Sequence, residues 1–498
     1  MSLILIANLP SPPGMDVYRD TAGAYGTAQY VWRKGYGHSS NVFFPTFIPY
    51  LATALQRAGH QVMALDGQVL RCNLAGFLGR LEDIHPDLVV TMPSLPSIDG
   101  DCYLLSCIRE LLPKTPIIAL GPASAALAGQ ILSIGRVDMI IKGSYPFYHG
   151  PILEFLDRTR HSPIEAQLPG TVVMGPSGQI AETPAAPATE RGNLDDLDLE
   201  VYRLLPVQKY RIAAMGPQGR LTNYFPIIGG KGCPFGCMYC PYPVGYGKRL
   251  VLKSPQVVVR EMQFLNENFG IEAFLFRDQL FTANKARVEA ICDLIISGGL
   301  DARWAVEARV DEVSPGMLAR MKKAGCIRIQ YGVETGDPQL LERVGKPGLS
   351  LAQISQGFED TVREGILAVA FVVFGLPGED WSAAEKTIDF VLKLNCDNVL
   401  CSVLTPYPGT PLFELAREKD LIVTYDWQKY TSRHVVMRTE RLSAEQLQRL
   451  RANFVRLFRL KQLSRMIRRD ERAPCAITWR ALAYRLQMAR EHILGRSQ

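Results

Sequence analysis

Three cysteines crowd into eight residues of this 498-residue chain: Cys233, Cys237 and Cys240, spaced C-x3-C-x2-C. Thiolates are soft ligands, so three of them on one turn favour zinc or an iron–sulfur cluster. Structural zinc takes four ligands, and no histidine lies near this turn. Three thiolates on a [4Fe–4S] cluster leave one iron free to bind a substrate or a cofactor. An open-site cluster is therefore the favoured hypothesis, and coincidental clustering of core cysteines is the alternative.

The cysteine turn resembles the cluster motif of radical S-adenosylmethionine (SAM) enzymes, C-x3-C-x-aromatic-C, with Tyr239 as the aromatic residue. Five later segments resemble the family in the same order: Phe276–Thr282, Trp304–Arg309, Gly332–Gly336, Phe374–Glu379 and Pro406–Thr410. The resemblance implies a [4Fe–4S] cluster on the three cysteines. It also implies SAM contacts by Tyr239, Asp278, Arg309, Glu334 and Gly375.

Two points stay open within this resemblance. Gln279 stands where the family usually has a second acidic residue, so only Asp278 carries over. A buried pair of Glu334 and Arg309 is also a common structural ion pair. No catalytic residue beyond the cofactor ligands is identified.

The first 160 residues alternate short apolar runs with helical stretches, which is typical of a parallel α/β sheet. Strands are expected at Leu3–Ala7, Gln61–Leu65, Asp87–Met92, Pro116–Leu120 and Val137–Ile141, with helices at Phe47–Ala58 and Asp101–Leu112. Ligands bind at the carboxyl ends of such strands. No G-x-G-x-x-G follows the first strand, so dinucleotide binding has no support. A Rossmann-like domain without a ligand is the alternative.

Pro45–Asp66 resembles the opening of the cobalamin-binding domain that precedes many radical SAM cores, and Pro86–Thr91 and Ile118–Ser124 resemble its next strand-and-loop pairs. The cobalt-ligating signature D-x-H-x-x-G is absent, and His85 is expected at a helix end. The resemblance implies cobalamin contacts by Thr91, Ser94, Gly121, Pro122, Ser124 and Gly143.

These patterns divide the chain into four parts. Residues 1–160 are expected to form the cobalamin-binding-like Rossmann domain, and 161–218 a connector with one hairpin across Gly175–Gly178. Residues 219–441 are expected to form a partial (β/α) barrel, the radical SAM core, and 442–498 a basic helical extension. Barrel strands are expected near Ala273–Phe276, Arg303–Glu307, Ile327–Tyr331, Ala368–Phe374 and Val399–Thr405.

The net charge of +6 is concentrated at the C-terminal end. Residues 441–498 hold 14 Lys and Arg against 4 Asp and Glu, a local +10, which leaves −4 on the remainder. The main body therefore lacks the charge of a nucleic-acid binder. Helices are expected at Leu442–Arg469 and Trp479–Ile493. Packing of the first across the core is favoured over contact with an anionic membrane surface.

A membrane-spanning helix needs about 18 apolar residues in a row, and no apolar run is that long. The N-terminal residues lack a secretory pattern. A cytoplasmic location with reduced cysteines is expected.

The resemblance implies an enzyme that uses a [4Fe–4S] cluster, SAM and cobalamin to methylate an unactivated carbon of a biosynthetic intermediate. The substrate is expected to be a small or lipid-like molecule, and the electron donor a flavodoxin or ferredoxin type of protein. One alternative is a cyclase or rearrangement enzyme with the same cofactors. Another is a non-enzymatic corrinoid or iron–sulfur carrier or sensor.

Overall fold

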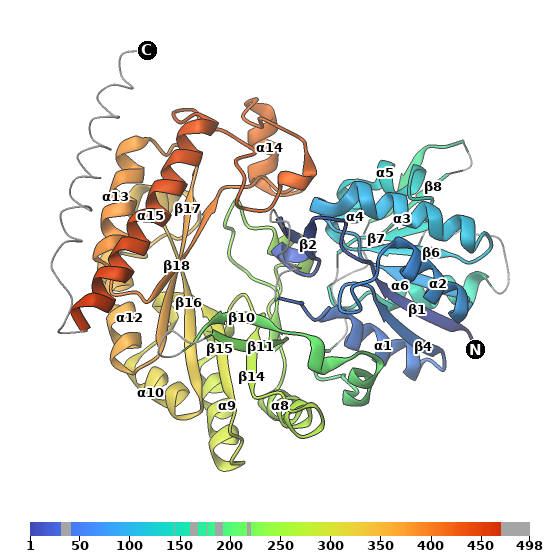
Figure 1. The fold of residues 1–498 in the computed structure, drawn as a ribbon, viewed down its shortest axis with the longest axis horizontal. Coiled ribbons are helices and arrows are strands. Elements are labelled where there is room, and N and C mark those ends of the chain that lie inside the picture. The colour runs from blue at the N-terminus through green and yellow to red at the C-terminus, as the bar shows by residue number, and fades with distance from the viewer. Residues whose placement is uncertain are drawn as a thin grey trace.

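Two seven-stranded sheets organise the chain (Figure 1). The computed structural model describes residues 1–30, 41–143, 145–159, 168–175, 177–184, 193–216 and 221–469. The first sheet lies toward the N-terminus and the second belongs to the later half of the chain. The predicted α/β class is confirmed.

The first sheet has the strand order β4-β1-β5-β6-β7-β8-β9. Its bounds are β1 Leu3–Asn8, β4 Gln61–Asp66, β5 Leu88–Thr91, β6 Ile117–Leu120, β7 Met139–Ile141, β8 Thr171–Met174 and β9 Ile180–Glu182. The five strands from β4 to β7 pair in parallel, whereas β8 and β9 are antiparallel. Their apolar runs are buried because helices cover both faces, as in doubly wound sheets.

The helices of this half are α1 Phe47–Arg57, α2 Leu74–Ile84, α3 Ile98–Leu111, α4 Gly121–Ala126, α5 Ala128–Ser133 and α6 His149–Thr159. Phe47 and Leu51 of α1 share a core with Ile6 and Val90. On the other face, Phe77 of α2 and Leu105 of α3 pack in a second core with Leu5 and Val89. Successive side chains of β1 and β5 therefore point to opposite faces of the sheet, and each face packs against its own layer of helices.

The first sheet extends beyond the boundary expected at residue 160. The hairpin expected across Gly175–Gly178 is present: its strand β8 pairs with β7, and β9 pairs with β8. Another strand in the expected connector, β10 (Ile212–Met215), pairs with the second sheet. The expected connector thus supplies edge strands to both sheets.

The second sheet has the order β10-β11-β14-β15-β16-β17-β18. Its further strands are β11 Leu221–Ile227, β14 Ala273–Phe276, β15 Arg303–Ala308, β16 Cys326–Glu334, β17 Leu367–Phe374 and β18 Asn398–Val403. The strands from β11 to β18 are parallel, and β10 is antiparallel to β11. The order ends at β10 and β18 without closing, so the predicted partial barrel is confirmed.

The barrel helices are α8 Pro255–Phe269, α9 Lys285–Ser297, α10 Pro315–Lys323, α11 Pro338–Arg343, α12 Leu351–Arg363, α13 Trp381–Lys393 and α14 Pro411–Glu418. Several begin with a side chain that accepts hydrogen bonds from the first turn, among them Ser314, Asp337, Ser350 and Thr410. Such caps satisfy backbone groups that the helix itself leaves free. They fix where each strand-to-helix loop ends.

The long helix α15 (Ala444–Arg469) runs beside α13 and β18 (Figure 1). Leu447, Leu450 and Phe454 are buried in the barrel core. Lys461 Nζ donates to the carbonyl of Leu394 at 2.7 Å, and Arg465 Nη1 donates to that of Cys396 at 2.8 Å. The packing expected for this helix is therefore observed. Trp479–Ile493 lies outside the described residues.

No helix in the described ranges has the length and apolar character needed to cross a membrane.

Candidate active site

The cysteine loop, residues 232–241, lies between β12 (Gly230–Lys231) and α7 (Tyr242–Tyr246). It follows the carboxyl end of β11, so it lies at the barrel edge where the parallel strands end. Backbone bonds hold the loop: Cys240 N–H donates to the Cys237 carbonyl at 3.0 Å, and Cys233 N–H to that of Gly247 at 3.2 Å. Leu412 N–H also donates to the carbonyl of Met238 at 3.0 Å.

The three thiols of the loop are half-buried and interact with one another. Burial raises the pKa of all three, to about 12 for Cys240, and each thiolate disfavours ionisation of a neighbour. In the described part of the chain, no three His, Cys, Asp or Glu side chains are placed to hold one metal ion. Cysteines of a [4Fe–4S] cluster each bind a different iron, so they need no common point. Three half-buried thiols on one loop fit a cluster core whose positive charge stabilises thiolates.

Tyr239 and Glu334, two of the residues predicted to contact SAM, come together beside these thiols, and a SAM contact by them stays a prediction. Glu334 ends β16, is 7% exposed and has a φ of 62°. Tyr239 forms a hydrogen bond with the Glu334 side chain, and its pKa is raised by burial and then by this carboxylate. A third residue, Lys346, donates from Nζ to Glu334 Oε1 at 2.7 Å.

Arg309 lies against the cysteine loop but does not pair with Glu334. Its guanidinium lies 4.2 Å from the centre of the Phe235 ring. Its Nε and Nη2 donate to both carboxylate oxygens of Asp311, at 3.0 and 2.8 Å. The alternative of a structural Glu334–Arg309 ion pair is therefore wrong, because each residue has another partner.

Asp278 anchors the chain that leads into the cysteine loop. Its Oδ1 accepts a hydrogen bond from Gly229 N–H at 2.7 Å, and Arg287 Nη2 donates to the Gly229 carbonyl at 2.6 Å. Burial raises the pKa of Asp278 to about 6. Its Oδ2 is buried and has no hydrogen-bond partner among the described residues. A SAM contact by Asp278 stays a prediction.

Gly375 forms the turn after β17, with a φ of 93°. Its N–H donates to Glu379 Oε2. A side-chain carbon built on Gly375 would lie 3.4 Å from Leu447 of α15 and 3.5 Å from Leu404. These neighbours belong to the packing beneath α15, and a SAM contact by Gly375 also stays a prediction.

The concave face of the barrel carries charged residues that the sequence analysis did not single out. Arg277, which follows β14, lies with Nη1 3.7 Å from Oε1 of Glu307 on β15. Their side chains are 15% and 23% exposed. On the next strand, Arg328 Nη2 donates to Gln330 Oε1 at 2.9 Å, while its Nε has no partner among the described residues. These charged residues could have been found from the sequence, because they stand in or next to runs of apolar strand residues.

The residues predicted to contact cobalamin share the carboxyl edge of the first sheet. Thr91 ends β5 and Ser94 follows it, Gly121, Pro122 and Ser124 begin α4 after β6, and Gly143 follows β7. Thr91, Ser94 and Ser124 are fully buried. The Ser124 hydroxyl donates to the Leu120 carbonyl at 2.8 Å, whereas Thr91 Oγ1 is buried without a partner among the described residues. His85 ends α2, as expected.

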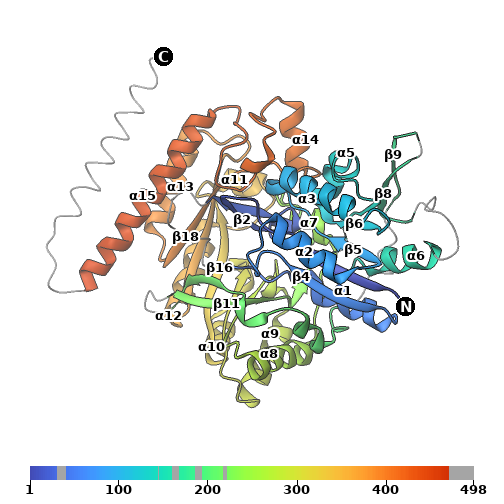
Figure 2. The ribbon, with the colours of Figure 1, turned by 45° about the vertical axis from the view of Figure 1, so that its right-hand side comes forward.

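The segment after β1 covers this edge. It contains the hairpin of β2 (Met15–Tyr18) and β3 (Thr27–Tyr30), with the turn Ala22–Ala24 between them. This turn contacts α4 on one side and α7 on the other, and β2 lies between the two sheets in both views (Figures 1 and 2). The segment of β2 and β3 therefore lies between the carboxyl edge of the first sheet and the barrel.

A buried ion pair fixes the covering segment. Arg19 pairs with Asp101 of α3, and its Nε also donates to the Leu9 carbonyl at 3.2 Å. Asp101 Oδ2 in turn accepts from Ser94 N–H at 3.0 Å.

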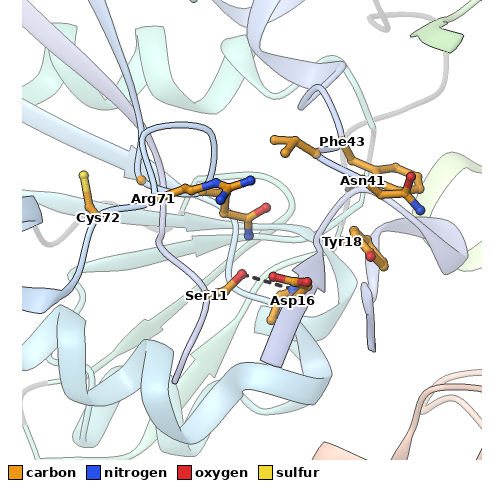
Figure 3. A pocket seen from close by; sticks show the side chains of 11 residues that line it. Ser11, Asp16, Tyr18, Asn41, Phe43, Arg71 and Cys72 are labelled. Carbon is orange, nitrogen blue, oxygen red and sulfur yellow. Dashed lines mark hydrogen bonds between the residues drawn. The ribbon is translucent and has the colours of Figure 1, made fainter. Parts of the chain in front are cut away.

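The ends of β1 and β4 leave a pocket of about 40 Å³, lined by residues that include Ser11, Asp16, Tyr18, Asn41, Phe43 and Arg71 (Figure 3). It is far below the ~300–1,000 Å³ of ordinary ligand sites. None of the residues predicted to contact cobalamin lines this pocket, and their contacts stay a prediction.

Residues 227–391 match the family model described as Radical SAM superfamily. This segment is a radical SAM domain. It spans β11 to α13 and contains the cysteine loop, Glu334 and Lys346. The predicted radical SAM core is confirmed.

Relatives and solved structures extend the similarity beyond the radical SAM domain. An uncharacterized methyltransferase of Pyrococcus horikoshii is 27% identical over 82% of this chain and 85% of its own length. The anaerobic magnesium-protoporphyrin IX monomethyl ester cyclase of Rubrivivax gelatinosus is 23% identical over 83% of this chain and 73% of its own. The structure of the cobalamin-dependent SAM radical enzyme OxsB with aqua-cobalamin and SAM bound aligns with a TM-score of 0.70 and 14% identity, covering 99% of this chain and 71% of that one. The predicted arrangement of a Rossmann-like domain before a partial barrel is thus a known fold.

Proposed function

We propose that this chain is a cobalamin-dependent radical SAM enzyme that methylates an unactivated carbon of a biosynthetic intermediate. The observation that carries the proposal is the meeting of Tyr239, Glu334 and Lys346 beside the three-cysteine loop, within the radical SAM domain. A carrier or sensor of a cluster has no need of this second set of polar groups. The methyltransferase relative from Pyrococcus horikoshii favours methyl transfer.

When bound, the cluster supplies an electron that cleaves SAM to a 5′-deoxyadenosyl radical, and the corrinoid supplies a methyl group. The chain's own residues bind, orient and exclude water. Cys233, Cys237 and Cys240 hold the cluster, and Glu334 orients SAM through hydrogen bonds. The half-buried cysteine loop and the covering segment of β2 and β3 keep water from the radical.

The concave face supports a small-molecule substrate with both polar and apolar parts. Arg277, Glu307 and Arg328 offer charged groups that few protein partners satisfy. On the neighbouring strands, Phe371 is paired in register with Leu400, which is 37% exposed. An apolar skeleton along β17 and β18 would place a polar substituent near the charged strands. This arrangement accommodates a lipid-like substrate as well as a cyclic one.

The cysteine loop is also placed to receive an electron from outside. Pro234 and Gly236 are exposed, although the thiols of Cys233 and Cys237 on either side of them are half-buried. An external protein of the flavodoxin or ferredoxin type can therefore approach one side of the loop while substrate lies on the other. Such a reductant is part of the proposal.

One anaerobic experiment tests the proposed chemistry. The chain is reconstituted with iron, sulfide and hydroxocobalamin, and then incubated with SAM and dithionite. We expect cluster absorbance, a bound corrinoid, 5′-deoxyadenosine and S-adenosylhomocysteine. An assembled cluster that never yields 5′-deoxyadenosine contradicts the radical proposal. Formation of 5′-deoxyadenosine without any methylated product, with a range of substrates, favours the cyclase alternative suggested by the Rubrivivax relative.

A further inference from the structure

Lys346 is a buried cation between the cysteine loop and the end of β16. It is 6% exposed, and its Nζ donates to the Gly332 carbonyl at 2.8 Å and to Glu334 Oε1 at 2.7 Å. Moving an ammonium group from water into the protein interior costs free energy unless the group is paired and hydrogen-bonded. Both partners of Lys346 lie on one strand end, so its charge holds that strand end in one conformation.

The conformation that Lys346 holds is an unusual one. Glu334 has a φ of 62°, in the left-handed region that residues with a side chain seldom adopt. Such a conformation persists only where surrounding contacts determine it. Through Lys346, the carboxylate of Glu334 is tied to the backbone carbonyl of Gly332, two residues before it. These hydrogen bonds aim the carboxylate toward Tyr239, which is its other hydrogen-bond partner.

Lys346 also lies next to a cluster cysteine. The preceding Gly345 has a φ of 94°, and a side-chain carbon there would lie 3.1 Å from Cα of Cys237. The Sγ of Cys237 lies 3.9 Å from the carbonyl oxygen of Gly345, the residue before Lys346, so the ligand and the segment that carries the ammonium are in contact. Arg309, which also lies against this loop, is paired with Asp311 through both carboxylate oxygens.

We infer that Lys346 is a positioning residue that fixes Glu334 for SAM and raises the reduction potential of the cluster through its charge. The inference rests on the proposed function. Reduction adds one electron, taken from the external reductant, to a cluster already surrounded by three thiolates. A buried positive charge at Cys237 stabilises this more negative state, since net charge and hydrogen bonding set cluster potentials. No bond to Lys346 forms or breaks.

The test compares Lys346→Met with Lys386→Met. Lys386 pairs with Asp337 at 2.8 Å in the same domain, but its side chain is 59% exposed, so this control removes the same charge from solvent. Each variant is reconstituted, its iron and sulfide are counted, and its midpoint potential is measured by redox titration followed by electron paramagnetic resonance. SAM binding is measured from the change in that signal. We expect Lys346→Met to have a more negative midpoint potential and to bind SAM about 10-fold more weakly.

A second substitution separates charge from packing. Lys346→Arg keeps the positive charge and is expected to restore the potential more fully than Lys346→Gln. If Lys346→Met assembles too little cluster to measure, the comparison of Lys346→Arg with Lys346→Gln decides the question. Equal midpoint potentials and equal SAM binding in all variants with full cluster content overturn the inference but leave the proposed function intact. A wild-type chain that assembles no cluster overturns both.

Discussion

The hydroxyl of Tyr25 donates a hydrogen bond to the carbonyl oxygen of Pro408, 383 residues further along the chain. Tyr25 lies in the segment that covers the edge of the first sheet, and Pro408 follows β18 of the barrel. Both residues are buried. The bond therefore ties the covering segment to the barrel across the space proposed for a corrinoid.

Removal of this bond is expected to speed corrinoid uptake. Tyr25→Phe leaves the buried Pro408 carbonyl without its partner, at a cost of about 1–3 kcal/mol to the closed state. A cost of about 1 kcal/mol to the closed state increases the population of the state in which the covering segment has opened about fivefold. Uptake of hydroxocobalamin, followed by stopped-flow absorbance, should accelerate by a similar factor. Tyr430→Phe is the control, because the Tyr430 hydroxyl bonds the Thr424 carbonyl within the barrel half. Equal rates in both variants contradict a gating role for Tyr25.

Glu379 is expected to make stability depend on pH. Its side chain is fully buried, accepts from Gly375 and Leu376 N–H and lies near the carboxylates of Asp380 and Asp337. Burial, assisted by those carboxylates, raises its pKa from 4.5 to about 8. The folded state therefore keeps a proton that the unfolded state releases between these values. Stability should fall as pH rises from about 4.5 to 8, by at most about 1.4 kcal/mol per pH unit from this group.

Glu379→Gln isolates this contribution. Glutamine keeps an oxygen for the two N–H donors and does not titrate. The difference in unfolding free energy between the variant and the wild type should grow in favour of the variant as pH rises from 5 toward 8. Denaturant unfolding at several pH values measures it. The exposed Glu342 gives the control, since Glu342→Gln should leave the slope as it is in the wild type. A parallel pH profile for Glu379→Gln would sink the assignment.

The strands of both sheets were predictable because their signal is local. Uninterrupted apolar runs such as Ala368–Phe374 are typical of strands buried on both faces, and each ended close to the expected residue. The three-cysteine loop was predictable for the same reason, since all its thiols lie within one turn. The hairpin of β8 and β9 was predicted from its turn residues, whereas β10 and β11 were not predicted because neither has a long apolar run.

Lys346 and the covering segment were not predicted, since their roles depend on distant contacts. Lys346 is 12 residues from Glu334, and the intervening α11 brings it back to the strand end. Residues 19–26 have no helical or strand periodicity, and their place depends on Asp101 and Pro408. Asp278 accepts a hydrogen bond from the Gly229 backbone, a contact that its place in the motif did not predict, and its SAM contact stays a prediction.

The cysteine loop should lose its cluster when one ligand is removed. Cys240→Ala leaves two thiolates in the loop, so visible absorbance and iron content after reconstitution should fall to background. Cys396→Ala provides the control, because Cys396 is a buried thiol outside the loop, 1% exposed. Full absorbance in Cys240→Ala would disprove the ligand assignment.

Two glycines of the loop separate backbone shape from ligand chemistry. Gly232 has a φ of 85°, and a side-chain carbon there would lie 2.0 Å from the carbonyl oxygen of Arg249. Gly232→Ala must therefore move the start of the loop, with a conformational cost of about 1–2 kcal/mol besides the clash. We expect incomplete cluster assembly and a lower melting temperature. Gly236 lies in the same loop with no atom within 4 Å of such a carbon, so Gly236→Ala should assemble the cluster normally. Equal iron and sulfide content in the two variants would show that the contact with Arg249 does not set the loop's shape.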